Sequence, residues 1–177
     1  MNLIDPQRTR APEDKFEQLI EVLDDMPTVM VVASPNATLA AARARPMSVA
    51  KRGDDGTLYF LTSATTSLVQ ELRKDDLGMC TGQNKTQYVS LAGIFNVVED
   101  RALIEELWSA MAEAWFPKGK EDPDIRVIVF RPTTAELWDM SGKKGIGYFI
   151  DVAKAWLTKE PPKGDPDVHT RVAVTEL

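Results

Sequence analysis

The sequence is poor in cysteine and histidine, the residues most often found in transition-metal sites and in acid–base catalysis at neutral pH. Its 177 residues include one cysteine, Cys80, and one histidine, His169. A lone cysteine excludes an intrachain disulfide and a cysteine-based zinc site. We expect Cys80 to pack inside a strand as a small hydrophobic residue. His169 lies in a stretch rich in proline, aspartate and threonine, where a solvated residue is a simpler interpretation than a catalytic one.

Long apolar runs and an excess of positive charge are also missing. No run approaches the ~20 apolar residues of a membrane-spanning helix, and the first residues lack the apolar core of a secretory signal. We therefore expect a cytoplasmic protein with no membrane partner. The net charge of −6 and the pI of about 4.9 make nucleic acid a poor partner as well. The composition fits one globular domain, residues 1–160, followed by a C-terminal tail, residues 161–177.

The order of apolar patterns and turn residues predicts an α+β fold. Helices are expected at 12–26, at 66–74, in a third segment that starts after the capping residue Asp100 and carries apolar residues from Leu103 to Met111, and at 147–157. Strands are expected at 28–33, 38–51, 57–62, 76–83, 86–98, 125–131 and 134–140, with a hairpin turn at 54–56, a bulge at Gly93 and an interruption at Pro132. Short turns between strands favour an antiparallel sheet of about six strands, closed into a barrel.

Positive charge and a polar turn come close together in the first half of the chain. Arg43 and Arg45 lie on one predicted strand, the next strand ends in Thr62 and Ser63, and a turn at 64–67 leads into a helix. Guanidinium groups, hydroxyls and the unpaired N–H groups of a helix start are the donors that bind phosphate. The pattern therefore predicts the phosphate end of a nucleotide-like cofactor site. Two alternatives remain: the arginines, with Lys51 and Arg52, form a solvated strand face, and the turn only caps the helix.

Several motifs, taken in order, resemble the pyridoxamine 5'-phosphate oxidase-like flavin-binding family, and within it the general stress protein 26 branch. The motifs are Arg45-x-Met47, Gly56-x-Leu-Tyr-Phe-Leu-Thr-Ser63, Tyr88–Gly93, Leu107-Trp108 with Trp115–Gly119, Glu121–Asp124 and Ala135–Asp139. The resemblance covers roughly residues 13–160. It implies a six-stranded antiparallel split β-barrel with flanking helices, acting as a homodimer with FMN, FAD or another flavin between the two chains.

The same resemblance implies which residues bind the flavin. One group lies along the flavin or contacts its phosphate: Arg45, Met47, Ser48, Leu61, Thr62 and Ser67. Ser90 and Trp138 are implied as contacts from the second chain. The resemblance identifies no catalytic residue, no metal site and no substrate.

One position departs from the family pattern. After the turn the family usually has a lysine that meets the phosphate, and this chain has Leu68. Loss of a charge-assisted contact removes roughly 1.5–3 kcal/mol of binding free energy. A Leu68→Lys change is therefore expected to tighten FMN binding, unless Arg43, Arg45 or Arg73 already supplies the charge.

Three functions are consistent with these features. The first is a flavin-dependent oxidoreductase, in which the flavin supplies the redox chemistry. The second is a non-catalytic, stress-related protein that binds flavin or another phosphorylated ligand, and the third is a dimeric barrel that has lost its ligand. Oxidation of pyridoxamine phosphate itself is not expected, because the C-terminal stretch offers few cations beyond Arg171 for a substrate phosphate. Trp108 and Trp115 are expected to be buried.

Overall fold

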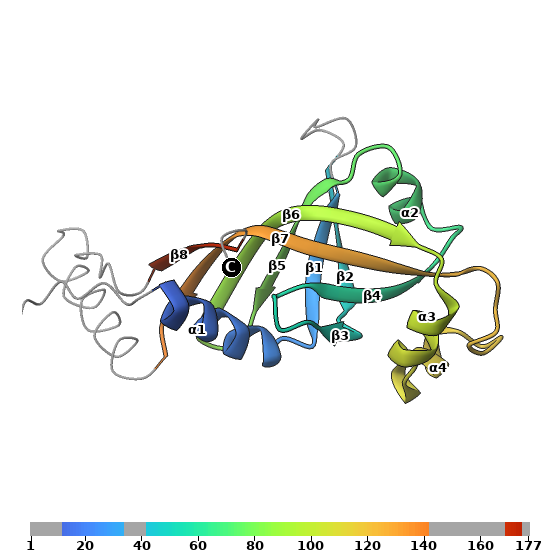
Figure 1. Cartoon of the computed structure of the whole chain (residues 1–177), viewed down its shortest axis with the longest axis horizontal. Coiled ribbons are helices and arrows are strands. Elements are labelled where there is room, and N and C mark those ends of the chain that lie inside the picture. The colour runs from blue at the N-terminus through green and yellow to red at the C-terminus, as the bar shows by residue number, and fades with distance from the viewer. Residues whose placement is uncertain (1–11, 34–41, 142–168, 175–177) are drawn as a thin grey trace, which may run out of the picture.

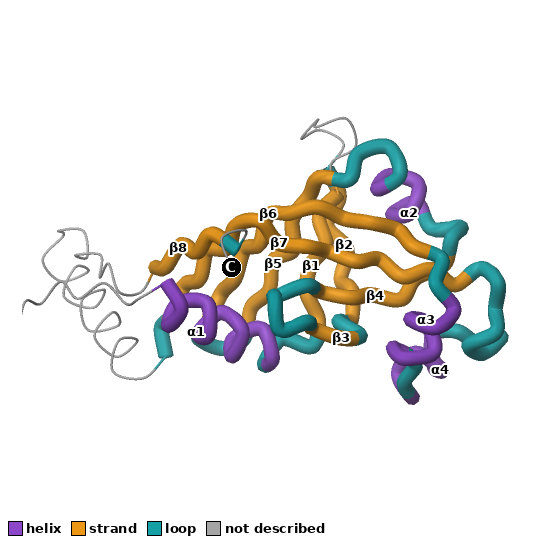
Figure 2. The backbone as a smooth tube through the Cα atoms, viewed as in Figure 1, coloured by secondary structure: helices purple, strands orange, loops and turns teal. Residues whose placement is uncertain are grey.

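The structure is a computed structural model that describes residues 12–33, 42–141 and 169–174. In these residues four helices surround one antiparallel sheet of eight strands (Figure 1 and Figure 2). The helices are α1 (Pro12–Asp24), α2 (Ser67–Leu72), α3 (Arg101–Leu107) and α4 (Ala110–Trp115). The strands are β1 (Thr28–Ala33), β2 (Arg43–Ser48), β3 (Lys51–Arg52), β4 (Leu58–Ser63), β5 (Leu77–Gln83), β6 (Gln87–Val98), β7 (Ile125–Asp139) and β8 (His169–Ala173). The helix expected at 147–157 lies outside the described residues.

The sheet is curled so that its two edges approach each other. The strand order is β2-β1-β5-β6-β7-β4-β3, which places β2 and β3 at opposite edges. Only Val49 and Ala50 separate these two strands in sequence. The N–H of Val49 donates to Pro27 O at 2.9 Å, and that of Ala50 donates to Tyr59 O at 2.8 Å. The expected antiparallel sheet is confirmed, and it is curled, but the single strand expected at 38–51 is wrong because the chain changes edge at Val49. The count of six is also exceeded.

One bulge sets the geometry of the two longest strands. Ala92 pairs with Thr134 and Gly93 with Pro132, so Thr133 is the extra residue on β7. A Cβ on Gly93 would lie 2.1 Å from Arg131 O, so only glycine allows this approach. The bulge predicted at Gly93 is confirmed. Pro132 does not divide β7 into two strands as expected, because a bulge tolerates a residue that lacks an N–H donor.

The inner face of the curled sheet holds the main hydrophobic core. Side chains alternate along each strand, and one set is buried together with the apolar stripe of α1 and with two residues of α2. The fully buried members include Leu19, Val31, Phe60, Leu91 and Phe130. Figure 1 shows α1 lying across one end of the sheet and α2 at the far end of β4. The core therefore fixes α2 against the strands that carry the candidate site.

A second, smaller core lies on the other face of the sheet, under α3 and α4. It contains Ile104 and Leu107 with the β7 residues Ile125, Val127 and Val129. The single helix expected here is wrong. The backbone is extended at Trp108 (ψ 130°) and at Ser109, whose Oγ accepts the Ala112 N–H at 3.3 Å and starts α4.

The break changes the environment of the aromatic residues of this region. Trp108 is partly buried and its ring lies 6.0 Å from that of Phe116. Trp115 is 72% exposed and Met111 is 61% exposed, so the expected burial of Trp115 is wrong. Met111 and Trp115 lie on the exposed side of the short helix α4, whereas Ala112 is buried.

The C-terminal tail contributes a strand that the sequence did not reveal. Residues His169–Ala173 form β8, which pairs with the second half of β7 from Thr134 to Trp138. The first half of β7 pairs with β4 instead. Among the described residues, no helix is both long and apolar enough to cross a membrane.

Candidate functional site

The Ser/Thr-rich turn between β4 and α2 is held by its own hydroxyl groups. Thr66 caps α2: its Oγ1 accepts the Val69 N–H at 3.4 Å and donates to Ser63 O at 2.9 Å. The buried hydroxyl of Thr62 lies 3.4 Å from that of Thr66. Capping is therefore confirmed as one role of the turn. The turn fixes the position of Ser67, the first residue of α2.

Arg45 reaches from β2 to α2 and joins Ser67 and Glu71. Its Nη2 donates to Ser67 Oγ at 3.2 Å and to Glu71 Oε1 at 2.7 Å. The side chain of Arg45 is 22% exposed and that of Glu71 is 15% exposed. Arg45 Nη1 and Glu71 Oε2 are buried and lack a hydrogen-bond partner among the described residues. We call these three residues the Arg45 group.

The sequence predicted that two members of this group, Arg45 and Ser67, lie close together, but it did not predict the third, Glu71. Arg45 and Ser67 were both expected at a bound phosphate, and they are in contact. Glu71 was not expected, and its carboxylate pairs with the guanidinium charge. A signal existed, because Ser67 and Glu71 are four residues apart and so share one face of a helix.

Leu68 points away from the Arg45 group. Its side chain is 2% exposed and belongs to the main core, together with Leu72 on the same helix. A lysine at this position would bury its ammonium group among apolar side chains. The expectation that Leu68→Lys tightens FMN binding is therefore replaced by an expected loss of folding stability.

The side chains of Leu61 and Thr62 lie on opposite faces of β4. The side chain of Leu61 is partly buried against the second core, whereas that of Thr62 is buried on the opposite face of β4. Tyr59 O accepts the Ala50 N–H at the β3 edge of β4. Because backbone groups alternate in direction along a strand, the N–H and C=O of Leu61 face the same edge. β3 pairs only with Leu58 and Tyr59, so among the described residues no strand pairs with Leu61 at this edge.

The remaining predicted residues divide between the two faces of the sheet. Met47 is two residues from Arg45 on β2, shares its face and packs against the main core. Ser48 is exposed on the opposite, outer face. Ser90 and Trp138 are also on the outer face, each partly buried, with Ser90 opposite Thr81 and Trp138 opposite Tyr88. The structure therefore separates the two residues expected from a second chain from the Arg45 group.

The outer face of β1, β2, β5 and β6 is apolar and open. Neighbouring strands place its side chains side by side: Met30 is opposite Pro46, Val32 is opposite Met79, and Leu77 is opposite Ile94. Its exposed large residues are Met30, Leu77, Met79, Tyr88 and Ile94. We call this surface the outer apolar face. Large contiguous apolar patches are unusual on the surface of monomeric proteins.

The other cations of the basic stretch have separate partners. Lys51 Nζ lies 2.5 Å from Glu106 Oε1, and this partner raises the pKa of Lys51. Arg52 Nε donates to Asp24 Oδ1 at 2.7 Å and thereby lowers the pKa of Asp24. Arg43 is exposed. The solvated or ion-paired interpretation thus applies to Lys51, Arg52 and Arg43, and only Arg45 is part of the buried group.

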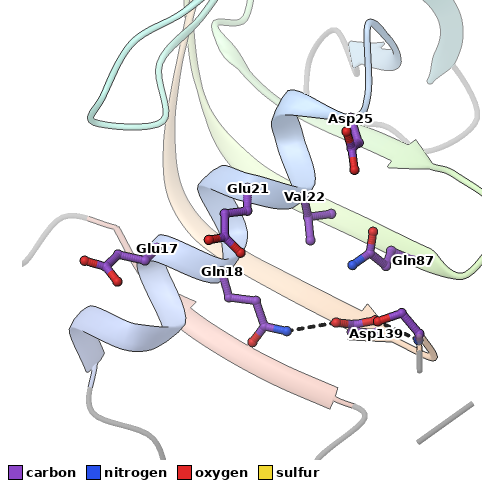
Figure 3. Close-up of a pocket in the computed structure, with 8 residues that line it drawn as sticks. Glu17, Gln18, Glu21, Val22, Asp25, Gln87 and Asp139 are labelled. Carbon is purple, nitrogen blue, oxygen red and sulfur yellow. Dashed lines mark hydrogen bonds between the residues drawn. The ribbon is translucent and has the colours of Figure 1, made fainter. Parts of the chain in front are cut away.

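A hollow of about 520 Å³ lies beside α1, and its chemistry differs from that of the Arg45 group (Figure 3). Its lining includes Glu17, Glu21, Asp25 and Asp139. Gln18 Nε2 donates to Asp139 Oδ2 at 3.0 Å. A surface lined by carboxylates repels a phosphate, so this hollow does not fit the anionic end of a flavin. In the part of the chain that the structure describes, no group of three or more potential ligands is placed to hold a metal ion.

The curled antiparallel sheet, with helices at its ends and the Arg45 group between β2 and α2, has the architecture of small split-barrel proteins. The chain belongs to the pyridoxamine 5'-phosphate oxidase-like family, whose model matches residues 14–163. A structure from Jannaschia sp., assigned as a general stress protein 26, is 27% identical with a TM-score of 0.67, covering 91% of this chain and 99% of that one. The general stress FMN/FAD-binding protein of Xanthomonas citri has a TM-score of 0.64 at 24% identity, covering 74% of this chain and 92% of that one.

A curated relative is similar over part of its length. The protein bli-3 of Neurospora crassa is 28% identical over 114 residues, which are 59% of this chain and 54% of that protein. The chain thus spans about half the length of this relative. The expected family and the general stress protein 26 likeness are supported by the family model and by the Jannaschia structure.

Proposed function

We propose that this chain binds a flavin, FMN in the first instance and FAD as the alternative, with the Arg45 group at the polar end of the cofactor. The observation that carries the proposal is the contact of Arg45 with Ser67, with Arg45 Nη1 buried and without a partner among the described residues. A buried donor of this kind costs free energy until something accepts from it. The Xanthomonas citri relative, which is an FMN/FAD-binding protein, supports the choice of ligand.

The described residues fit such a cofactor in three ways. Arg45 and Ser67 offer donors to the polar end of the cofactor, and the unpaired edge at Leu61 offers backbone N–H and C=O groups. Met47, beside Arg45, offers an apolar surface. A bound flavin would supply redox chemistry of its own, and the protein residues would position it and set its electrostatic surroundings. The finer proposal is a flavin-dependent oxidoreductase, and the alternative is a stress protein that binds flavin without turnover.

We further propose that the chain forms a homodimer through its outer apolar face, with the flavin between the two chains. Ser90 and Trp138 lie on or beside that face and not at the Arg45 group, as contacts supplied by a second chain would. The exposed methionine and leucine side chains of the face would lose their contact with water in such an assembly. A complete cofactor site would then contain residues of both copies.

The test is a fluorescence titration of FMN with the wild type, Arg45→Ala and Arg43→Ala. Arg43 shares the strand and the face with Arg45 but is exposed, so it is a matched control for the loss of one charge. Loss of a charge-assisted contact of roughly 1.5–3 kcal/mol weakens FMN binding by about 10- to 100-fold in Arg45→Ala. Arg43→Ala is expected to stay within about threefold of the wild type.

Arg45→Ala also leaves Glu71 buried without its cation, so folding needs its own control. The double variant Arg45→Met/Glu71→Gln keeps this position uncharged, and circular dichroism reports whether it is folded. A wild type with no saturable flavin binding would refute the proposal. Equal FMN affinities of Arg45→Ala and the wild type would show that the Arg45 group is not part of the flavin site. NADH or NADPH added to the loaded wild type distinguishes turnover from binding alone.

A further inference from the structure

The charge of Arg45 is already paired before any ligand binds. Glu71 Oε1 is 2.7 Å from Arg45 Nη2, and both side chains are more than three-quarters buried. Each residue also holds one buried atom without a partner among the described residues, Nη1 of Arg45 and Oε2 of Glu71. The pair therefore presents one donor and one acceptor to a ligand, and it has no net charge.

A hydroxyl group matches this pair better than a phosphate does. A hydroxyl both accepts and donates, so hydroxyls can satisfy Nη1 and Oε2 together. A phosphate dianion only accepts, and its charge meets the carboxylate of Glu71 in a partly buried site where repulsion is poorly screened. The favourable contact of a phosphate with Arg45 is thus offset by the unfavourable one with Glu71.

The other residues of α2 do not restore a positive site. Leu68 is buried in the main core, so its position cannot supply a cation. Arg73 and Lys74 are exposed at the end of the helix, and Arg43 is exposed on β2. Exposed cations contribute little binding free energy, and salt screens them.

We infer that the Arg45–Glu71 pair binds the hydroxyl-bearing chain of the flavin and that Glu71 is the residue that lowers the preference of this protein for a phosphorylated flavin. The inference rests on the proposed flavin binding and adds the specificity of the same site. Riboflavin, which has the hydroxyl chain and no phosphate, is then a ligand comparable to FMN.

The experiment compares riboflavin and FMN, each titrated by fluorescence quenching at one ionic strength, with the wild type, Glu71→Gln and Glu113→Gln. Glu113 is exposed on α4, so its variant carries the same charge change away from the site. The wild type is expected to bind the two flavins within about threefold of each other. Removal of a like charge in Glu71→Gln is expected to tighten FMN binding about tenfold or more and to leave riboflavin within about threefold. Glu113→Gln is expected to change neither.

A wild-type preference for FMN of about tenfold or more that Glu71→Gln leaves unchanged would overturn the inference and keep the proposed flavin binding. Absence of saturable binding of both flavins to the wild type would overturn both. If Glu71→Gln does not fold, as judged by circular dichroism, Glu71→Met provides a second uncharged side chain of similar length. The same gain for FMN over riboflavin is expected from it, and its absence counts against the inference.

Discussion

The two faces of the curled sheet are built from the same strands and have different surroundings. On β1, Val31 is fully buried and its neighbour Met30 is 37% exposed; on β5, Cys80 is fully buried and Met79 is 39% exposed. Both faces are apolar, yet only the inner one is covered by α1 and α2. One alternating pattern thus supplies two apolar surfaces. The inner one is buried in the main core, whereas the outer one is covered by α3 at β7 and stays exposed on β1, β2, β5 and β6, where we propose assembly.

The largest effect is expected where a charge enters the inner face. Leu68→Lys buries an ammonium group without a partner, so the free energy of unfolding is expected to fall by more than about 3 kcal/mol. Leu68→Met is the control, because a side chain of similar volume costs less than about 1.5 kcal/mol. Urea denaturation measures both. A Leu68→Lys protein as stable as the wild type would mean that position 68 is not part of the inner core.

A charge on the outer face is expected to act on assembly and not on folding. Met79→Asp places a carboxylate at the centre of the outer apolar face, opposite Val32 and Ala92. Sedimentation equilibrium is expected to show a dimer for the wild type and a monomer for the variant, with an unchanged circular dichroism spectrum.

The matched control for this change is Ala110→Asp, which puts the same charge on the exposed first residue of α4, where a helix tolerates it. This variant is expected to stay dimeric. A monomeric wild type, or a Met79→Asp protein that still dimerises, would show that the outer apolar face is not a dimer interface.

The smallest effect is expected at the end of β7, where α1 meets the inner face. Burial raises the pKa of Asp139, but hydrogen bonds, the foremost from Ser141, outweigh burial and leave the pKa below its usual value. A depressed pKa stabilises the fold above the unfolded-state pKa of about 3.9, and this stability is lost as the pH falls through the lower, folded-state pKa.

Asp139→Asn is therefore expected to cost roughly 1 kcal/mol at pH 7, and the difference from the wild type is expected to shrink in acid. Thermal melts of both proteins between pH 7 and pH 3 measure it. A difference that does not change with pH would show that packing, and not charge, is what the aspartate contributes.

Local patterns in the sequence were enough to predict most of the elements. The stripe that includes Leu19 and Leu23 predicted α1, and Asp100 was predicted and found as the cap of α3. The turn predicted at 54–56 is present, with Gly56 at a φ of 79°. These features depend on residues within a few positions of each other, which is why sequence patterns reveal them.

The features that were missed depend on distant parts of the chain. Glu71 meets Arg45 only because β2 and α2 come together in three dimensions. The inward direction of Leu68 follows from which side of α2 faces the core, and the pairing of β8 with β7 joins residues far apart in sequence. The order of a cationic strand, a polar turn and a helix start predicted that Arg45 and Ser67 meet, but neither this pattern nor the family resemblance predicted the Glu71 carboxylate or the burial of position 68.

The extra residue Thr133 has a consequence for how β7 can vary in length. Before it, even-numbered residues such as Ile128 and Phe130 face the main core; after it, odd-numbered residues such as Ala135 and Leu137 do so. Deletion of Thr133 would leave Pro132 and Thr134 adjacent and still opposite Gly93 and Ala92, so the bulge would disappear while Leu137 kept its inward direction. Loss of a paired residue within either half would instead turn the side chains beyond it to the opposite face. Related chains should therefore vary in length at Thr133 more readily than within the paired halves of β7.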